Sequence, residues 1–227
     1  SSFLGGQLSL EPDDTIPHLL SGTATLGLIS AQFNIITPLT GKTALSLSAR
    51  RTFINTFYGN LLQFNGNPLR YGFTDANLTF LYKPDNHNTF DVNVFFSHDR
   101  GECNYADYKM NVGADWGNAF AAARWRHSKD GWSTSTSVFM SGFMLDGHIY
   151  QETTKGVMPA HTIHYGIKSD NRLAHDIKLN ASLSYYDILP QDPSVSSNKA
   201  GTSGQENQHA FEADIYLDKR FTLGHSF

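Results

Sequence analysis

The chain has 227 residues, of which 40% are hydrophobic and 17% charged, and its formal net charge is −4 at pH 7. No stretch approaches the roughly 18 uncharged apolar residues that a spanning helix needs, so a helical membrane protein is excluded. An aromatic content of 13% excludes disorder, and the near-neutral charge gives no footprint for nucleic acid, so no nucleic-acid partner is expected. A membrane β-barrel stays open, because its strands alternate lipid-facing and lumen-facing side chains and average hydropathy hides them.

Alternating apolar and polar residues recur along the chain, with the two-residue period of β-strands. The clearest case is residues 89–99, where Phe90, Val92, Val94 and Phe96 are predicted on one face, opposite Asp91, Asn93, Ser97 and Asp99. Turn signals lie at residues 38–42, 84–88, 128–131 and 169–172. We predict ten strands, at residues 22–29, 31–37, 42–53, 71–83, 89–99, 108–127, 132–146, 160–169, 175–187 and 208–221.

The connections between these strands are predicted to alternate in length. Long segments are expected at 54–70, 100–107, 147–159 and 189–208, provided that residues 108–127 form one strand through Trp116-Gly117-Asn118. Outer-membrane barrels place short turns in the periplasm and long loops outside. Aromatic residues near the strand ends fit an interfacial girdle: Phe53, Phe57, Tyr58, Tyr71, Phe73, Trp116, Trp125, Trp132, Tyr150, Tyr185 and Tyr186. The fold class predicted is therefore all-β, an antiparallel transmembrane β-barrel with about ten strands present.

With the strands placed, several segments resemble the TonB-dependent outer-membrane receptors, especially the Bacteroidetes type with a carboxypeptidase-regulatory-like N-terminal domain. The matching segments are Gly5-Gly6-Gln7-Leu8-Ser9, Gly27 to Asn34, Ser48-Ala49-Arg50-Arg51-Thr52, Tyr71 to Leu78, and Asp115-Trp116-Gly117-Asn118 with Trp125. Their order and spacing carry the resemblance, which covers roughly residues 5–145. Beyond that, only the rhythm of strands and loops matches.

This resemblance implies a domain organisation and partners. Residues 1–20 would be the end of a plug domain and its connection, and residues 21–227 the N-terminal portion of the barrel. Transporters of this type close 22 strands around a plug, so ten strands are expected to be a part of such a barrel. The chain begins Ser1-Ser2 without a methionine, which fits a processed product, an engineered piece or a fragment. The implied partners are the remaining barrel and plug, the TonB complex, outer-membrane lipid and, in some relatives, a surface lipoprotein lid.

The implied function is binding and import of a nutrient (a glycan, a peptide or a metal chelate) across the outer membrane, with long loops extracellular. Arg50 is expected in the lumen, contacting the plug or an anionic substrate, or else forming a salt bridge with Asp75, and Arg51 faces outward. Asn77 is a further lumen candidate. Tyr105 and Tyr150 could stack on sugars or peptides, although girdle positions are the alternative.

Catalytic and metal sites are not expected. His161 and His164 are three residues apart and would point to opposite faces of a strand. A metal site at His148 with Asp146 and Glu152 is the weaker reading beside solvated loop residues. Cys103 is predicted in a polar loop as a bystander. No residue pattern indicates an enzyme, and no cofactor is expected.

Two other interpretations stay open at this point. One is a complete small outer-membrane barrel of ten strands with a structural or adhesion role, for which Phe221, Leu223 and Phe227 resemble a C-terminal aromatic signal. The other is a soluble carbohydrate-binding β-sandwich, favoured only by the mean hydropathy of −0.35.

Overall fold

The structure, a computed structural model, describes residues 15–152, 154–174, 177–190, 194–196 and 206–219. The expected end of a plug at residues 5–9 and the C-terminal aromatic signal at residues 221–227 lie outside the described residues. No helix among the described residues is long and apolar enough to cross a membrane.

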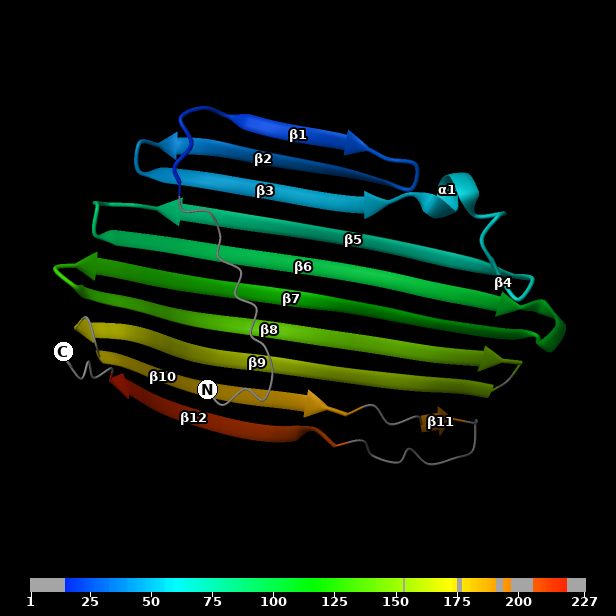
Figure 1. The fold of residues 1–227 in the computed structure, drawn as a ribbon. Helices are drawn as coiled ribbons and strands as arrows, with labels where there is room; N and C mark the ends of the chain where they lie inside the picture. The colour runs from blue at the N-terminus through cyan, green and yellow to red at the C-terminus, as the bar shows by residue number, and fades with distance from the viewer. Residues whose placement is uncertain (1–14, 153, 175–176, 191–193, 197–205, 220–227) are drawn as a thin grey trace, which may run out of the picture.

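Ten strands form one antiparallel sheet in the order of the chain (Figure 1). These strands are β1 (Ser21–Leu26), β2 (Ser30–Thr40), β3 (Thr43–Thr52), β5 (Asn67–Tyr82), β6 (Asn88–Tyr105), β7 (Met110–Lys129), β8 (Trp132–Gln151), β9 (Thr154–Ala174), β10 (Ile177–Leu189) and β12 (Gln208–Lys219). Two short strands, β4 (Gln63–Phe64) and β11 (Ser194–Ser196), pair with β5 and β9. The helical turns are α1 (Ile54–Tyr58) and η1 (Ala106–Tyr108). The all-β, antiparallel, barrel-type fold is confirmed.

Strands β8 and β9, with 20 and 21 residues, are longer than predicted, whereas β7 has the expected length of 20 residues. The prediction that one strand runs through Trp116-Gly117-Asn118 is confirmed, because these residues pair without interruption with β6 and β8. At about 3.4 Å per residue, a 20-residue strand extends far beyond an apolar band of about 25 Å.

Three predicted connections are wrong for the same reason. Residues 100–107 belong mostly to β6, residues 147–159 mostly to β8 and β9, and residues 169–172 lie inside β9 rather than in a turn. These segments are rich in glycine and polar residues, which resemble loops in sequence. Antiparallel pairing needs only backbone groups. Strands with polar side chains can therefore continue beyond the apolar part of the sheet.

The predicted turns at residues 38–42, 84–88 and 128–131 each join two strands. In the last of them, Asp130 (φ 51°) and Gly131 (φ 80°) join β7 to β8 as the two central residues of a tight hairpin. Asn65 and Gly66, within the segment that we expected to be one long connection, do the same between β4 and β5. Both are the Asn/Asp-Gly pairs that such hairpins favour, because both central residues need a left-handed backbone.

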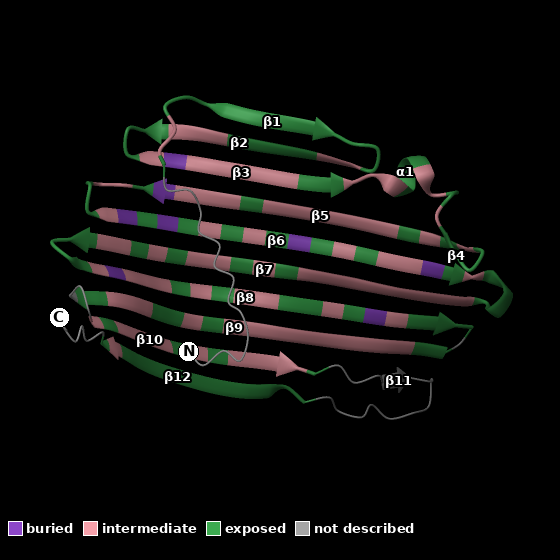
Figure 2. Ribbon diagram, viewed as in Figure 1, coloured by how far each residue is buried: buried purple, intermediate pink, exposed green. Residues whose placement is uncertain are grey.

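The two faces of the sheet differ in how closely their side chains are enclosed. Along β6, Phe90, Val92, Val94 and Phe96 are exposed, whereas Asp91 and Ser97, which alternate with them, are buried (Figure 2). Side chains crowd together on the concave side of a curved sheet and splay apart on the convex side. The enclosed set therefore marks the concave face, here called the inner face, and the exposed set marks the outer face.

Register pairing extends this difference across the sheet. One line of paired residues on the outer face is apolar from β2 to β12: Ile35, Leu47, Leu78, Val94, Ala121, Met140, Tyr165, Tyr185 and Phe211. We call it the apolar outer row. A soluble sheet would bury such a row and expose the polar one; this sheet does the reverse.

Aromatic rings on the outer face border the apolar rows at one end. Tyr82 stacks on Phe90 with ring centroids 6.0 Å apart, and Phe90 stacks on Trp125 at 6.4 Å. His127 then bridges Trp125 to Trp132. Trp125 and Trp132 lie on the outer face, as a girdle would require. The prediction is wrong for Tyr71, Phe73, Trp116 and Tyr186, whose register places them on the inner face.

The outer face changes character eight residues along β6 from the aromatic border, where His98 and Arg100 follow Phe96. That span is about 27 Å along a strand, or about 20 Å of height at the usual barrel tilt of about 40°. The apolar band along β6 is therefore somewhat shorter than the band of about 25 Å that is typical of outer-membrane barrels.

Both edges of the sheet are open. Within the described residues, β1 pairs only with β2, and β12 only with β10. The ten strands thus form a curved sheet that does not close on itself.

Candidate functional site

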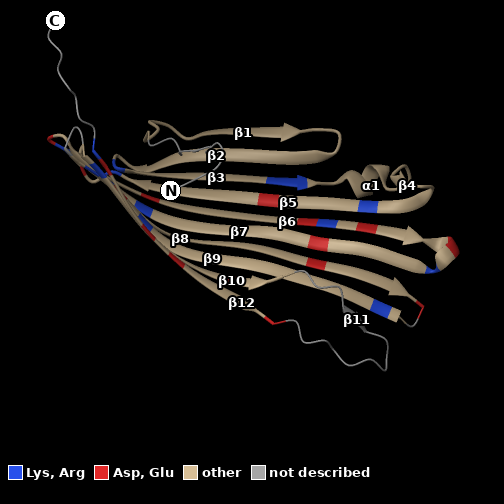
Figure 3. Cartoon of the chain, turned by 60° about the horizontal axis from the view of Figure 1, so that its bottom comes forward, with Lys and Arg blue, Asp and Glu red and all other residues tan. Residues whose placement is uncertain are grey.

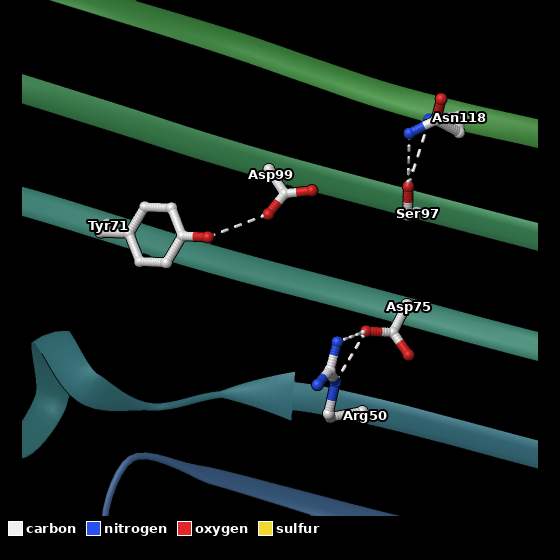
Figure 4. Close-up of polar contacts among 6 residues, drawn as sticks. All are labelled: Arg50, Tyr71, Asp75, Ser97, Asp99 and Asn118. Carbon is white, nitrogen blue, oxygen red and sulfur yellow. Dashed lines mark hydrogen bonds and ion pairs between the residues drawn. The ribbon is translucent and has the colours of Figure 1, made fainter. Parts of the chain in front are cut away.

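A continuous line of polar side chains crosses the inner face from β2 to β7. It consists of Gln32, Arg50, Asp75, Ser97 and Asn118, which are paired in register on successive strands. We call it the polar inner row; four of its members are drawn in Figure 4. Every second residue of a strand faces inward, so this row is built by one position from each strand.

The predicted salt bridge between Arg50 and Asp75 is present. Arg50 Nε donates to Asp75 Oδ2 at 2.9 Å, and Arg50 Nη2 lies 2.8 Å from the same oxygen. The guanidinium carbon also lies 4.7 Å from the centroid of the Phe73 ring. Half of the Arg50 side chain remains exposed, so its remaining donors face the space enclosed by the sheet.

Farther along the row, Ser97 connects β6 to β7. Its hydroxyl oxygen accepts hydrogen bonds from the backbone nitrogen and from Nδ2 of Asn118, both at 3.2 Å (Figure 4). These contacts fix the strand pair at the level where β7 passes through Gly117.

An aromatic group lies beside the polar inner row. Tyr71 packs at 6.1 Å from Phe73 and 6.5 Å from Trp116, measured between ring centroids, and its hydroxyl donates to Asp99 Oδ1 at 3.1 Å. Flat ring faces and a charged group at their margin suit planar or hydroxylated ligands. We treat Arg50, Tyr71, Phe73, Asp99 and Trp116 as the candidate site, on the inner face.

A second charged group was not anticipated from the sequence. Asp91, which is 2% exposed, lies on the inner face between two arginines of β7. Arg124 Nε donates to its Oδ1 at 3.0 Å, and Arg126 Nη2 lies 3.5 Å from the same atom. Lys168 lines the same hollow, which has a volume of about 600 Å³. The two-residue period places Arg124 and Arg126 on one face of β7, but only the register between β6 and β7 brings Asp91 to them.

Charged side chains lie on several strands and toward the ends of the sheet (Figure 3). Both the polar inner row and the Asp91 group carry opposite charges in contact. Such pairs satisfy each other while they are enclosed, and they leave the centre of the outer face to apolar residues.

The other predicted site residues do not join the candidate site. Asn77 also faces inward, two residues along β5 from Asp75. Tyr105 ends β6 and pairs with Met110. Tyr150 pairs with Asn111 and lies on the outer face. Lys155 Nζ lies 5.4 Å from the centroid of the Tyr150 ring.

The structure also shows where His161, His164 and Cys103 lie. His161 pairs with Met144 on the outer face and His164 with Ser141 on the inner face, so the two point apart as predicted. Cys103 is buried in β6, and its predicted placement in a loop is wrong. Among the described residues, no group of three or more His, Cys, Asp or Glu side chains is arranged to hold a metal ion.

A scan against models of protein families gives no match, and a search of curated proteins gives none either. Among solved structures, the chain is similar to the ferric yersiniabactin uptake receptor FyuA from Yersinia pestis, with a TM-score of 0.53 and 10% sequence identity. The match covers 86% of this chain and 35% of the receptor chain. At this identity the likeness shows the fold alone: the curved sheet resembles about a third of that receptor's chain.

Proposed function

We propose that the chain is part of the barrel wall of a TonB-dependent outer-membrane transporter that binds a nutrient and imports it. The observation that carries this proposal is the reversed polarity of the two faces. An apolar outer face with a band about 20 Å high and a polar inner face suit a sheet with lipid on one side and a lumen on the other. The fold of the yersiniabactin receptor supports the same conclusion.

Location and partners follow from the proposal. The sheet would lie in the outer membrane, with the η1 hairpin and the β8–β9 hairpin extracellular and the Asp130-Gly131 turn periplasmic. Its partners would be the remaining strands, a plug, the TonB complex and outer-membrane lipid. The Bacteroidetes type, with its carboxypeptidase-regulatory-like domain and a lipoprotein lid, rests on the motifs at residues 27–34, 48–52 and 71–78.

The candidate site would contact substrate or plug from the lumen side. Tyr71, Phe73 and Trp116 offer ring faces, while Arg50 and Asp99 offer a charged donor and an acceptor. This set fits a glycan, a peptide or a metal chelate.

The alternatives fit the structure less well. The described residues form one sheet rather than the two packed sheets of a sandwich. A complete ten-strand barrel would require β1 to pair with β12, and that pair is absent within the described residues.

Spin labels on β6 test the proposal. In a Cys103→Ser background, single cysteines at Val92 and Val94 are labelled in vesicles and compared with cysteines at Asp91 and Asn93. We expect oxygen to relax the first pair more effectively and a water-soluble nickel chelate to relax the second. The opposite pattern, or nickel access to both faces, would contradict the membrane assignment.

A further inference from the structure

The outer face contains a groove of about 450 Å³ that crosses β7 and β8 near the end of the apolar band that His98 marks. Its floor is made by Gly117, Ala119 and Gly142, and exposed Phe96, Met144 and Tyr165 stand around it. Met140 lies in the groove as well. The groove is continuous with the apolar outer row, which contains Met140 and Tyr165.

Gly142 has no internal reason to be glycine. A Cβ atom built on it would meet no atom within 4 Å, and Gly142 is not among the positive-φ residues. The pairing of β8 with β7 and β9 is regular through this position. At Gly117, by contrast, a Cβ would lie 2.5 Å from the Ser97 carbonyl oxygen, so internal packing explains that glycine.

Glycine inside a strand weakens it and often marks a place where a ligand approaches the backbone closely. At Gly142 the approach would come from the open, outer side. The methionines beside it suit an occupant of irregular shape, because their side chains are flexible and polarisable.

Polar groups gather at the end of the groove near His98. His98 Nε2 lies 3.4 Å from Asp115 Oδ1, and Arg100 Nε lies 3.8 Å from the same oxygen. Asp146 and His161 also line this end. Arg100 lies beside the groove rather than in its lining, and its Nη2 also lies 3.6 Å from Glu102 Oε2. Its side chain is more than half exposed, and its N–H donors suit a phosphate. An apolar floor that leads to a charged rim is complementary to an amphiphile.

We propose that this groove is a lipid-binding site, in which one acyl chain of a membrane phospholipid lies over Ala119 and Gly142 with its polar head at Arg100 and Asp115. The occupant is a lipid rather than a second copy of the chain, because the groove opens on the face that the proposed function places in the bilayer. The inference rests on that proposed function.

Photo-crosslinking tests it. The full chain is reconstituted in phosphatidylcholine vesicles that contain a small fraction of phosphatidylethanolamine with a diazirine on one acyl chain. Crosslinked residues are then mapped by mass spectrometry. We expect the yield at residues 117–119 and 140–144 to exceed the yield at Leu47 and Leu78, on the apolar outer row outside the groove, by at least about five-fold.

Two substitutions of equal size separate the groove from the rest of the face. Ala119→Leu fills the groove. Ala121→Leu adds the same volume at the next outward-facing residue of β7, which does not line the groove. Ala119→Leu and Gly142→Leu should lower the groove crosslinks at least about five-fold, and Ala121→Leu should leave them unchanged.

The possible failures are distinguishable. Even crosslinking over the outer face, or equal losses in Ala119→Leu and Ala121→Leu, overturns the groove proposal and leaves the membrane assignment standing. Crosslinks between two protein chains at the groove overturn the choice of lipid. If labelled lipid reacts nowhere on the outer face, the proposed function fails as well.

Discussion

Asp91 shows at the level of one residue what the inner face requires. Its carboxylate is almost fully enclosed and in contact with Arg124 and Arg126, whereas the Arg50–Asp75 pair is half open to solvent. A buried ion pair that loses one partner leaves an uncompensated charge, while an exposed pair contributes little.

We therefore expect Asp91→Asn to lower the free energy of unfolding by about 3–5 kcal/mol, and Asp75→Asn by less than about 1 kcal/mol. Urea titration of the vesicle-bound protein, followed by tryptophan fluorescence, measures both. Equal losses would show that the two carboxylates are enclosed to the same degree, contrary to the structure.

Asp85 adds a pH dependence in the β5–β6 turn, outside the strands. Hydrogen bonds from the Asn88 side chain and from the backbone N–H of His87 hold the pKa of Asp85 below its ordinary value of 3.8. A lowered pKa stabilises the fold above the ordinary value, and that contribution is lost as pH falls through the folded-state pKa.

Asp85→Ala should therefore be less stable than the original chain at pH 7, and the difference should shrink as the pH falls below 3.8. Urea midpoints of the two proteins, measured at pH 7 and pH 3, give the comparison. A difference that grows on acidification would be evidence against these hydrogen bonds.

Strands β7 and β8 each have a glycine that lines the groove, but the two glycines differ in the space around them. Gly117 lies against the Ser97 carbonyl, whereas Gly142 faces open space. Gly117→Ala should cost about 1–3 kcal/mol of stability because the strands must shift, and Gly142→Ala should stay within about 0.5 kcal/mol of the original. Urea unfolding of the matched pair measures this, and a larger cost for Gly142→Ala would contradict the groove geometry.

The hairpin ends test the orientation of the sheet. Lys109 Nζ lies 3.6 Å from Glu152 Oε1, so the η1 hairpin and the β8–β9 hairpin end side by side. Single cysteines at Lys109 and Glu152 should react with a membrane-impermeant maleimide on intact cells, and a cysteine at Asp130 should react only after lysis. Labelling of the Asp130 position from outside would invert the topology.

Sequence reasoning found the elements whose signal is local. The alternation in β6 and the Asp130-Gly131 turn depend on period and backbone preference alone, and both are present. The polar segments at 100–107, 147–159 and 169–172 were assigned to loops because strand pairing with distant partners decides their structure. Tyr71 and Trp116 were placed in the girdle for a related reason: nearness to a strand end does not determine the face.

The candidate site was only partly predictable. Arg50 and Asp75 follow from alternation and neighbouring strands, and their contact is as expected. The Asp91 group required the register between β6 and β7, which puts Asp91 directly opposite Arg124. No local pattern fixes that register.

At the scale of the whole molecule, the open edges are the main unsatisfied feature. β1 and β12 each present one row of backbone groups without a strand partner among the described residues, and lipid does not tolerate unpaired strand edges. The isolated chain should therefore associate edge to edge or require further strands.

Crosslinking and gel analysis in detergent should show oligomers or aggregates of the isolated chain. Mixing it with a longer barrel segment that supplies the next strands should convert them to a defined complex. A heat-modifiable monomer with ion conductance would instead support a complete ten-strand barrel.

The reversed polarity of the two faces also sets a rule for how the gene can change. Inserting one codon in the middle of β6 would move every later residue of that strand to the opposite face, so that inward-facing positions become outward-facing and the reverse. Inserting two codons restores the faces and only lengthens the strand. Length variation within these strands should therefore accumulate in pairs of residues, whereas the hairpin ends can gain or lose residues singly.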